Sequence, residues 1–134
     1  MVYENSPMIR RIVLLAAVTL LPCLAQAQEQ PISVYFEPLK GRDVASLNEA
    51  IREALSQPPL RLETKPSPQT VIISAPSQVD VSKKRISGTF YSFTIAFSRD
   101  GHSLGQSQQD CGTDTLSVCT DQIVQDVKTA AAQR

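Results

Sequence analysis

The alternation of apolar and polar residues predicts strands in the first part of the chain. The segment "ISVYFEP", residues 32–38, turns its isoleucine, valine and phenylalanine to one face, which is the period of a half-buried strand. Residues 60–64, "LRLET", fit a short strand with its leucines inward. The run "TVIISAP", residues 70–76, is apolar and rich in β-branched side chains, which is typical of a central strand covered on both faces. Residues 77–84 read as a connector or a ragged strand.

The longest strand pattern lies further along, at residues 85–98. Its apolar side chains change face at residues 90–91, so we expect a bulge or bend there, eased by Gly88. An Asp-Gly pair at 100–101 predicts a hairpin turn. The returning segment, residues 103–110, is almost entirely polar. The hairpin makes this segment pair with the preceding strand although it has few apolar residues to bury. Such a strand is typical of a sheet edge or of an exposed face.

Two segments have the 3.6-residue period of amphipathic helices. The first segment, residues 44–57, follows Asp43, whose carboxylate suits an N-cap. It ends before a Pro-Pro pair, and Asn48 lies on its polar side. The second spans residues 114–133. The apolar stripes comprise Val44, Leu47, Ile51, Ala54 and Leu55 in the first helix and Leu116, Cys119, Ile123, Val127 and Ala130 in the second.

The order of these elements, β-α-β-β-β-β-α, predicts the fold class. A helix with one apolar stripe must bury that stripe, and a sheet with one apolar face offers the surface to bury it against. We therefore predict an α+β fold, a two-layer sandwich. It would combine a mixed or antiparallel sheet of about four to five strands with two helices on one face.

The N-terminal segment, residues 1–27, has the pattern of a secretory signal peptide. Two arginines precede an apolar run of about ten residues, too short for the roughly 20 that span a bilayer, and the triplet Ala25-Gln26-Ala27 ends it. We expect cleavage after Ala27. The signal is complete from Met8 onward, so both Met1 and Met8 stay open as the translation start. Two alternatives stay open: lipidation at Cys23, and export through a twin-arginine signal.

The remaining residues, 28–134, predict a single small α+β domain. This part carries 11 Lys/Arg and 12 Asp/Glu, a balance that argues against a nucleic-acid binder, which would concentrate basic residues on one face. It also holds no second apolar run long enough to span a membrane. With the signal peptide, these features place the protein in the periplasm or outside the cell.

Cys111 and Cys119 are the two cysteines that remain after cleavage. A structural zinc site needs four ligands, and the only histidine is His102, at the hairpin tip. Redox pairs typically have two residues between their cysteines, whereas seven separate these two. An even pair in an oxidising compartment instead predicts a structural disulfide, which would contribute roughly 2–3 kcal/mol by closing a short loop.

Catalytic chemistry has little support in the sequence. A Ser-His-Asp arrangement would have to use His102, which sits beside a glycine in a turn. Capping and solvation account for the carboxylates near the last helix: Asp110, Asp114, Asp121 and Asp126. The chain carries no Gly-rich phosphate loop, EF-hand or nucleophile elbow, so we predict no catalytic residue, cofactor or metal site.

Two segments are candidates for contact with partners. Lys83, Lys84 and Arg85 form the only compact basic run, and they either keep the following strand from aggregating or contact an anionic partner. The polar strand could accept a partner strand at its edge, with main-chain hydrogen bonds as the source of affinity. The glutamines Gln106, Gln108 and Gln109 would then line the contact.

These observations favour an exported, non-enzymatic protein that acts through an unknown protein partner in the cell envelope. The element order resembles that of small α/β domains in bacterial envelope assembly proteins, such as the N-terminal domain of the Tol translocation protein and related lipoprotein activators. This resemblance implies an accessory role in envelope assembly and assigns no residue a role. An alternative is a secreted inhibitor or immunity-type protein that blocks a partner enzyme. A small hydrolase is a third hypothesis, with the least support.

Overall fold

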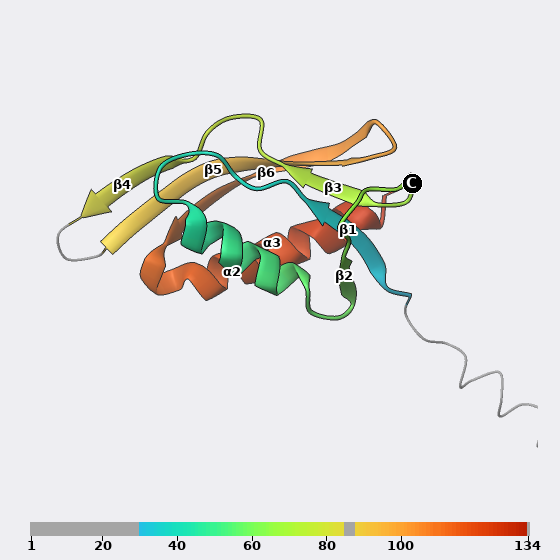
Figure 1. Cartoon of the computed structure of the whole chain (residues 1–134), viewed down its shortest axis with the longest axis horizontal. Coiled ribbons are helices and arrows are strands. Elements are labelled where there is room, and N and C mark those ends of the chain that lie inside the picture. The colour runs from blue at the N-terminus through green and yellow to red at the C-terminus, as the bar shows by residue number, and fades with distance from the viewer. Residues whose placement is uncertain (1–29, 85–87, 134) are drawn as a thin grey trace, which may run out of the picture. The chain divides into compact units, whose positions relative to one another are not determined.

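A computed structural model of the chain describes residues 30–84 and 88–133. They form six strands, two α-helices and one short 3-10 helix (Figure 1). The predicted signal peptide and its cleavage site lie outside the described residues. The elements are, in chain order, β1 (Ile32–Phe36), α2 (Ala45–Leu55), β2 (Leu60–Leu62), β3 (Val71–Ser74), β4 (Asp80–Lys84), β5 (Gly88–Arg99), β6 (His102–Gly112), η1 (Thr113–Thr115) and α3 (Leu116–Ala131).

The predicted fold class is confirmed: this is an α+β domain with a mixed sheet, and both helices lie on one face of it (Figure 1). Strand β1 runs parallel to β2 and to β3, whereas β5 runs antiparallel to β3, β4 and β6. The sheet has one strand more than the four to five expected. The additional strand is β4, which lies in residues 77–84, the segment that the sequence pattern left as a connector or a ragged strand. Neither of the two described α-helices combines the length and the hydropathy that a membrane span requires.

Strand β5 is the centre of the sheet. Strand β6 pairs with it from Phe90 to Arg99, so the other partners of β5 must share its opposite edge. There β4 pairs with the first half of β5, and β3 with the second half. The sheet therefore continues as β2-β1-β3 beside one half of β5 and as β4 beside the other half.

The core lies between the sheet and the helices. Four alternate side chains of β5 are buried toward the helices: Tyr91, Phe93, Ile95 and Phe97. The predicted helical stripes face them, and their buried members are Val44, Leu47, Ile51, Leu55, Cys119, Ile123, Val127 and Ala130. The helices thus bury their apolar stripes on one face of the sheet and leave its other face open (Figure 1).

Two expectations about the strands were wrong. Strand β3 is covered on one face only: Val71 and Ile73 are buried, but Ile72 is half-buried on the open face, beside Tyr35 of β1. The bulge expected at residues 90–91 is absent, because the pairing of β5 with β4 and β6 continues through these residues without a register shift; Phe90 lies half-buried on the open face. The register shift in the β5–β6 pairing lies at the other end, where Leu104 is the extra residue.

The connection from β1 to α2 is held by Asn48. Its side-chain Oδ1 accepts a hydrogen bond from the Leu39 N–H at 2.8 Å, and its Nδ2 donates to the Leu39 carbonyl at 3.0 Å. The predicted cap at Asp43 is absent: α2 begins after Val44 without a side-chain cap, and the Asp43 carboxylate pairs with Lys83 instead. Asn48 falls on the polar side of the helix pattern, and its side chain joins α2 to the loop between β1 and α2.

We expect Asn48→Ala to lower the free energy of unfolding by about 1–3 kcal/mol, because it leaves both backbone groups of buried Leu39 without these bonds. Urea denaturation measures this change. Glu49→Ala is the matched control at the next, exposed helix position, and should change the stability by no more than about 0.5 kcal/mol. Equal effects of the two substitutions would contradict the role of Asn48.

Candidate functional site

Strand β6 is an edge strand. It is eleven residues long, and among the described strands it pairs with β5 alone. Its exposed side chains on the open face of the sheet are Gln106, Gln108 and Asp110. Two of them bond to side chains of β5: Thr94 Oγ1 donates to Gln108 Oε1 at 2.7 Å, and Ser92 Oγ donates to Asp110 Oδ1 at 2.7 Å. The edge is thus long and polar.

Gln109 has a different environment from the other two glutamines of the predicted contact. Its side chain is only 5 % exposed and lies on the helix side of the sheet. Its Nε2 donates to Asp126 Oδ2 of α3 at 2.9 Å and to Ser107 Oγ at 3.0 Å. Because side chains alternate along a strand, residue 109 shares a face with inward Cys111, not with residues 106 and 108. Gln109 therefore contacts α3 and cannot line a contact on the open face.

Cys111 and Cys119 form a disulfide. It joins the end of β6 to the inward face of α3, with a Cα–Cα distance of 5.7 Å, and both cysteines are buried. The chain between them turns through η1, where the Gly112 N–H donates to Thr115 Oγ1 at 3.3 Å. The disulfide thus fixes one end of β6 to the helix beneath it.

The opposite end of β6 is held by the last turn of the chain that the structure describes. Gln133 Nε2 donates to the carbonyl of Leu104, the extra residue of the register shift, at 2.9 Å. Gly105, the next residue, has a φ of +122°, a conformation that glycine adopts without strain. Together with the disulfide and the Gln109–Asp126 bond, this contact links β6 to the α3 region at three points along its length.

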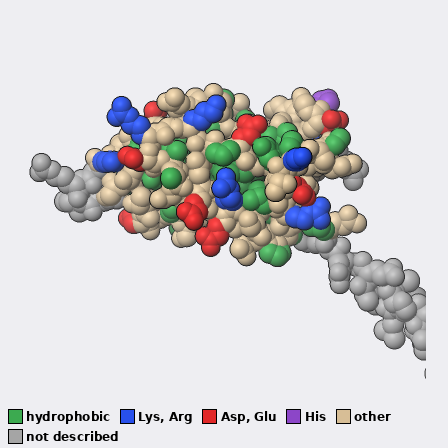
Figure 2. Space-filling model, in the orientation of Figure 1, with side chains coloured by type: hydrophobic (Ala, Val, Ile, Leu, Met, Phe, Trp, Pro, Cys, Tyr) green, Lys and Arg blue, Asp and Glu red, His purple; other side chains and the backbone are tan. Residues whose placement is uncertain are grey.

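The basic run is only partly described. Lys83 Nζ forms an ion pair with Asp43 Oδ2 at 3.1 Å, and both side chains are well exposed. Lys84 pairs with Gly88 through its backbone at the end of β4, and the position of Arg85 lies outside the described residues. On the face seen in Figure 2, basic and acidic side chains are interspersed, and neither sign dominates.

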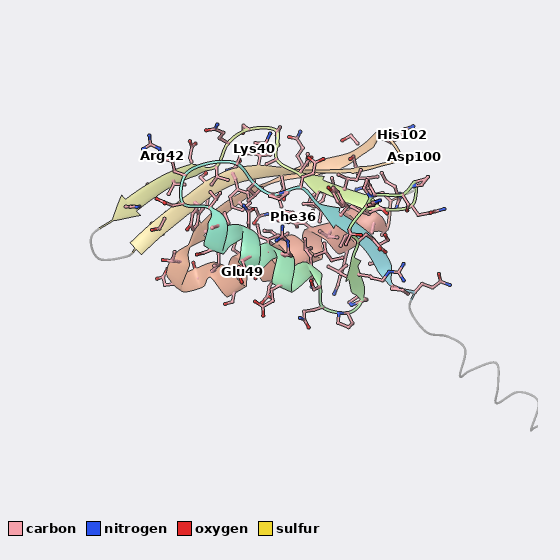
Figure 3. All side chains as sticks on the ribbon, in the orientation of Figure 1. Phe36, Lys40, Arg42, Glu49, Asp100 and His102 are labelled. Atoms are coloured by element: carbon pink, nitrogen blue, oxygen red, sulfur yellow. A yellow bond between two sulfur atoms is a disulfide. The ribbon has the colours of Figure 1, made fainter. Side chains whose placement is uncertain are left out.

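His102 lies at the exposed tip of the β5–β6 hairpin, beside Asp100 (Figure 3). Its Nδ1 lies 2.9 Å from the Asp100 carbonyl oxygen. The carboxylates near the last helix do not converge on it: Asp110 binds Ser92, and Asp126 binds Gln109 and Gln122. Within residues 30–84 and 88–133, no three His, Cys, Asp or Glu side chains lie together as a metal site.

Comparison with known proteins adds no family to this description: no family model, curated protein or solved structure matches the chain. The site is therefore defined by its own geometry. The candidate functional site is strand β6, which has an open edge and is attached to α3.

Proposed function

We propose that this chain is an exported, non-enzymatic binding protein of the cell envelope. It binds a partner protein by accepting an extended partner segment as an additional strand along β6. The observation that carries this proposal is the edge of β6 itself: among the described strands β6 pairs with β5 alone, so every second residue along it turns its main-chain donor and acceptor away from β5.

The composition of the edge supports this use. Natural proteins protect edge strands with lysines, prolines, inward-pointing charges or short lengths. Residues 103–110, "SLGQSQQD", contain no lysine, arginine or proline, and their single charge, Asp110, points outward. The register shift at Leu104 protects one end, and the remaining six residues, from Gly105 to Asp110, are long enough to pair with a partner strand.

The attachments of β6 to α3 lower the entropic cost of binding a partner strand. A partner strand gains affinity when the edge is ordered beforehand, because ordering a loose segment consumes part of the interaction free energy. The disulfide, the Gln109–Asp126 bond and the Gln133–Leu104 bond hold β6 in place before any partner arrives. A disulfide also suits an oxidising compartment, which agrees with the signal-peptide pattern.

The edge proposal is tested with the paired substitution Gln106→Lys and Gln108→Lys, which places two edge-protecting charges on the exposed side of β6. The control pair, Gln57→Lys and Gln78→Lys, adds the same charge at exposed glutamines away from β6. Partners are captured from envelope extracts and then titrated. We expect the edge pair to weaken binding by about tenfold or more, because each lost main-chain hydrogen bond contributes about 1 kcal/mol, and the control pair to bind as the unchanged protein does.

Hydrogen–deuterium exchange of the complex locates the contact directly. We expect the amides of residues 105–110 to exchange more slowly once the partner is bound. Protection confined to other segments, equal binding by both lysine pairs, or no reproducible capture would each contradict the proposal.

A further inference from the structure

The charge around strand β6 is one-sided. Between Arg99 and Lys128 the sequence contains aspartates but neither lysine nor arginine, although the chain as a whole has a formal net charge of zero at pH 7. The aspartates are Asp100, Asp110, Asp114, Asp121 and Asp126. Strand β6 and most of α3 belong to this stretch, so the edge of the sheet is formed by the acidic part of the chain.

Two of these carboxylates flank the edge at consecutive positions of β6. Asp110 is exposed on the open face, where its Oδ1 accepts a hydrogen bond from Ser92 Oγ. The preceding residue, Gln109, points to the helix side, where its Nε2 donates to Asp126 Oδ2 at 2.9 Å. Because consecutive side chains of a strand point to opposite faces, the edge has one carboxylate on each face at positions 109 and 110.

The charges of Asp110 and Asp126 are not balanced by a neighbouring cation. Their hydrogen-bond donors are uncharged: the Ser92 hydroxyl for Asp110, and the amides of Gln109 and Gln122 for Asp126. Among the described side chains, neither carboxylate forms an ion pair. A carboxylate has about four acceptor positions, so each can still bind a further donor.

The cation nearest in sequence before this stretch, Arg99, is engaged elsewhere. It donates to the carbonyls of Ala131 and Gln133 at the end of α3. Gln133 in turn bonds to Leu104, so Arg99 lies toward the opposite end of β6 from Asp110. The two carboxylates are therefore left to a partner.

We propose that the segment accepted by β6 carries two consecutive basic residues. This inference rests on the proposed function, because it specifies the partner of the same edge. Residues directly opposite each other on neighbouring strands place their side chains on the same face of the sheet. The partner residue opposite Asp110 therefore points to the open face, and its neighbour, opposite Gln109, points to the helix side near Asp126. A lysine or arginine at both positions meets both carboxylates.

A second copy of this chain does not suit the edge. Pairing of β6 with β6 brings the same acidic stretch to both sides of the interface, and like charges across an interface lower the affinity. We expect light scattering of the protein alone to give the mass of one chain. A dimer that protects the amides of residues 105–110 from hydrogen exchange would overturn the proposal of a basic partner.

Three synthetic peptides with blocked ends test the chemistry of the partner. All consist of threonine and valine except at two positions, which hold adjacent lysines, adjacent glutamines, or two lysines separated by one residue. Amide chemical shifts of the purified protein locate and measure the binding.

We expect the peptide with adjacent lysines to shift the amides of residues 105–110. The glutamine peptide should bind about fivefold more weakly or less, because it lacks both charges. The peptide with separated lysines should bind at least about twofold more weakly, because its lysines share one face and reach one carboxylate. Raising the salt concentration from about 0.05 M to about 0.5 M should remove most of these differences.

Matched variants test the two carboxylates. Asp110→Asn together with Asp126→Asn keeps an oxygen that accepts from Ser92 and from Gln109 but removes both charges. We expect this pair to weaken binding of the adjacent-lysine peptide by about fivefold or more and to leave the glutamine peptide within about twofold.

The control pair is Glu49→Gln together with Asp121→Asn, which removes the same charge at exposed positions. Glu49 lies on α2, and Asp121 lies one helical turn from Ser117, on the side of α3 beside α2. This pair should change binding of the adjacent-lysine peptide by less than about twofold.

Equal binding of the lysine and glutamine peptides at residues 105–110 would overturn the basic partner and leave the edge as a binding site. Equal binding of adjacent and separated lysines would overturn the requirement for consecutive residues. The proposal is also overturned by shifts confined to other segments, by absence of binding, or by equal effects of the two variant pairs. The proposed function is tested separately, with the captured partner and the lysine substitutions in β6, so the two proposals can fail independently.

Discussion

Removal of the disulfide, by Cys111→Ala together with Cys119→Ala, is expected to lower the free energy of unfolding by about 2–3 kcal/mol. The bond closes a loop of eight sequence positions, which restricts the unfolded chain. The folded state loses little packing by comparison, because each substitution removes one sulfur atom. In a domain of this size such a loss corresponds to a fall in the melting temperature of about 10–20 °C.

Thermal denaturation of the double variant measures this effect. The unchanged protein in reductant should show a similar fall. Val118→Ala is the matched control, because Val118 lies within the closed loop but is 67 % exposed, and it should leave the melting temperature nearly unchanged. The intact mass of the exported protein should be two hydrogens below the dithiol value. Two free thiols in that protein, or an unchanged melting temperature in the double variant, would refute a stabilising disulfide.

A truncation in the core, Leu47→Ala, should have an effect at least as large. Leu47 is fully buried on α2, against the sheet, so its loss removes apolar contacts and leaves a cavity. Substitutions of this kind cost about 2–5 kcal/mol. Urea denaturation should show a lower midpoint with an unchanged slope.

Leu47→Met provides the control for this prediction, because it keeps the volume of the side chain and should cost less than about 1.5 kcal/mol. A loss below about 1 kcal/mol for Leu47→Ala would mean that the stripe of α2 does not support the core.

The elements of this fold could be predicted because their signals are local. The stripes of α2 and α3 repeat every three to four residues, and the Asp100-Gly101 pair marks the β5–β6 turn. Strand β4 was less distinct, because few of its residues contact the core: Val81 is half-buried, and Ser82 and Lys83 are exposed. Its pairing with β5 makes it a strand. The order of the strands has no local signal, since it depends on contacts between distant segments.

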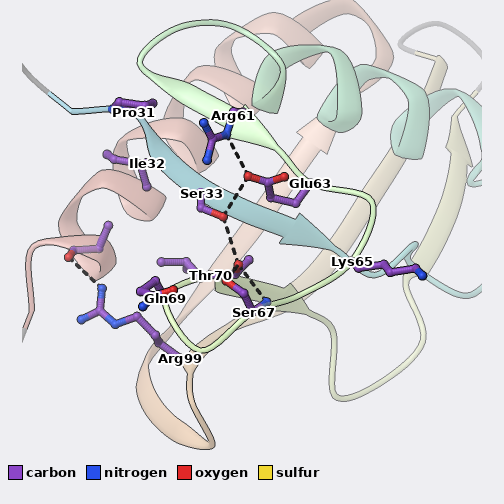
Figure 4. Close-up of a pocket in the computed structure, with 12 residues that line it drawn as sticks. Pro31, Ile32, Ser33, Arg61, Glu63, Lys65, Ser67, Gln69, Thr70 and Arg99 are labelled. Atoms are coloured by element: carbon purple, nitrogen blue, oxygen red, sulfur yellow. Dashed lines mark hydrogen bonds and ion pairs between the residues drawn. The ribbon is translucent and has the colours of Figure 1, made fainter.

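The residues of the candidate surfaces likewise fall into those with a local sequence signal and those that depend on contacts between distant segments. The polar edge was visible in the sequence, because a hairpin forces residues 103–110 to pair whatever their side chains are. The face that each glutamine occupies required the register of β6, which turns Gln109 toward α3 and Gln106 and Gln108 to the open face. The hydrogen bond between Ser33 and Thr70 (Figure 4) could not be predicted, because 37 positions separate these residues in the chain. Asn48 looked like a solvated helix residue for the same reason: its partner, Leu39, lies in the preceding loop.

The position of α3 at the end of the described chain has a consequence for biosynthesis. A ribosome releases the polypeptide from its N-terminus, so the apolar face of β5 emerges before the helix that covers it and before either cysteine of the disulfide. Exposed apolar strand surface of this kind promotes aggregation of incomplete chains. The apolar face of β5 therefore stays uncovered until α3 has been made, and we expect any truncation that removes α3 to expose this face and to promote aggregation.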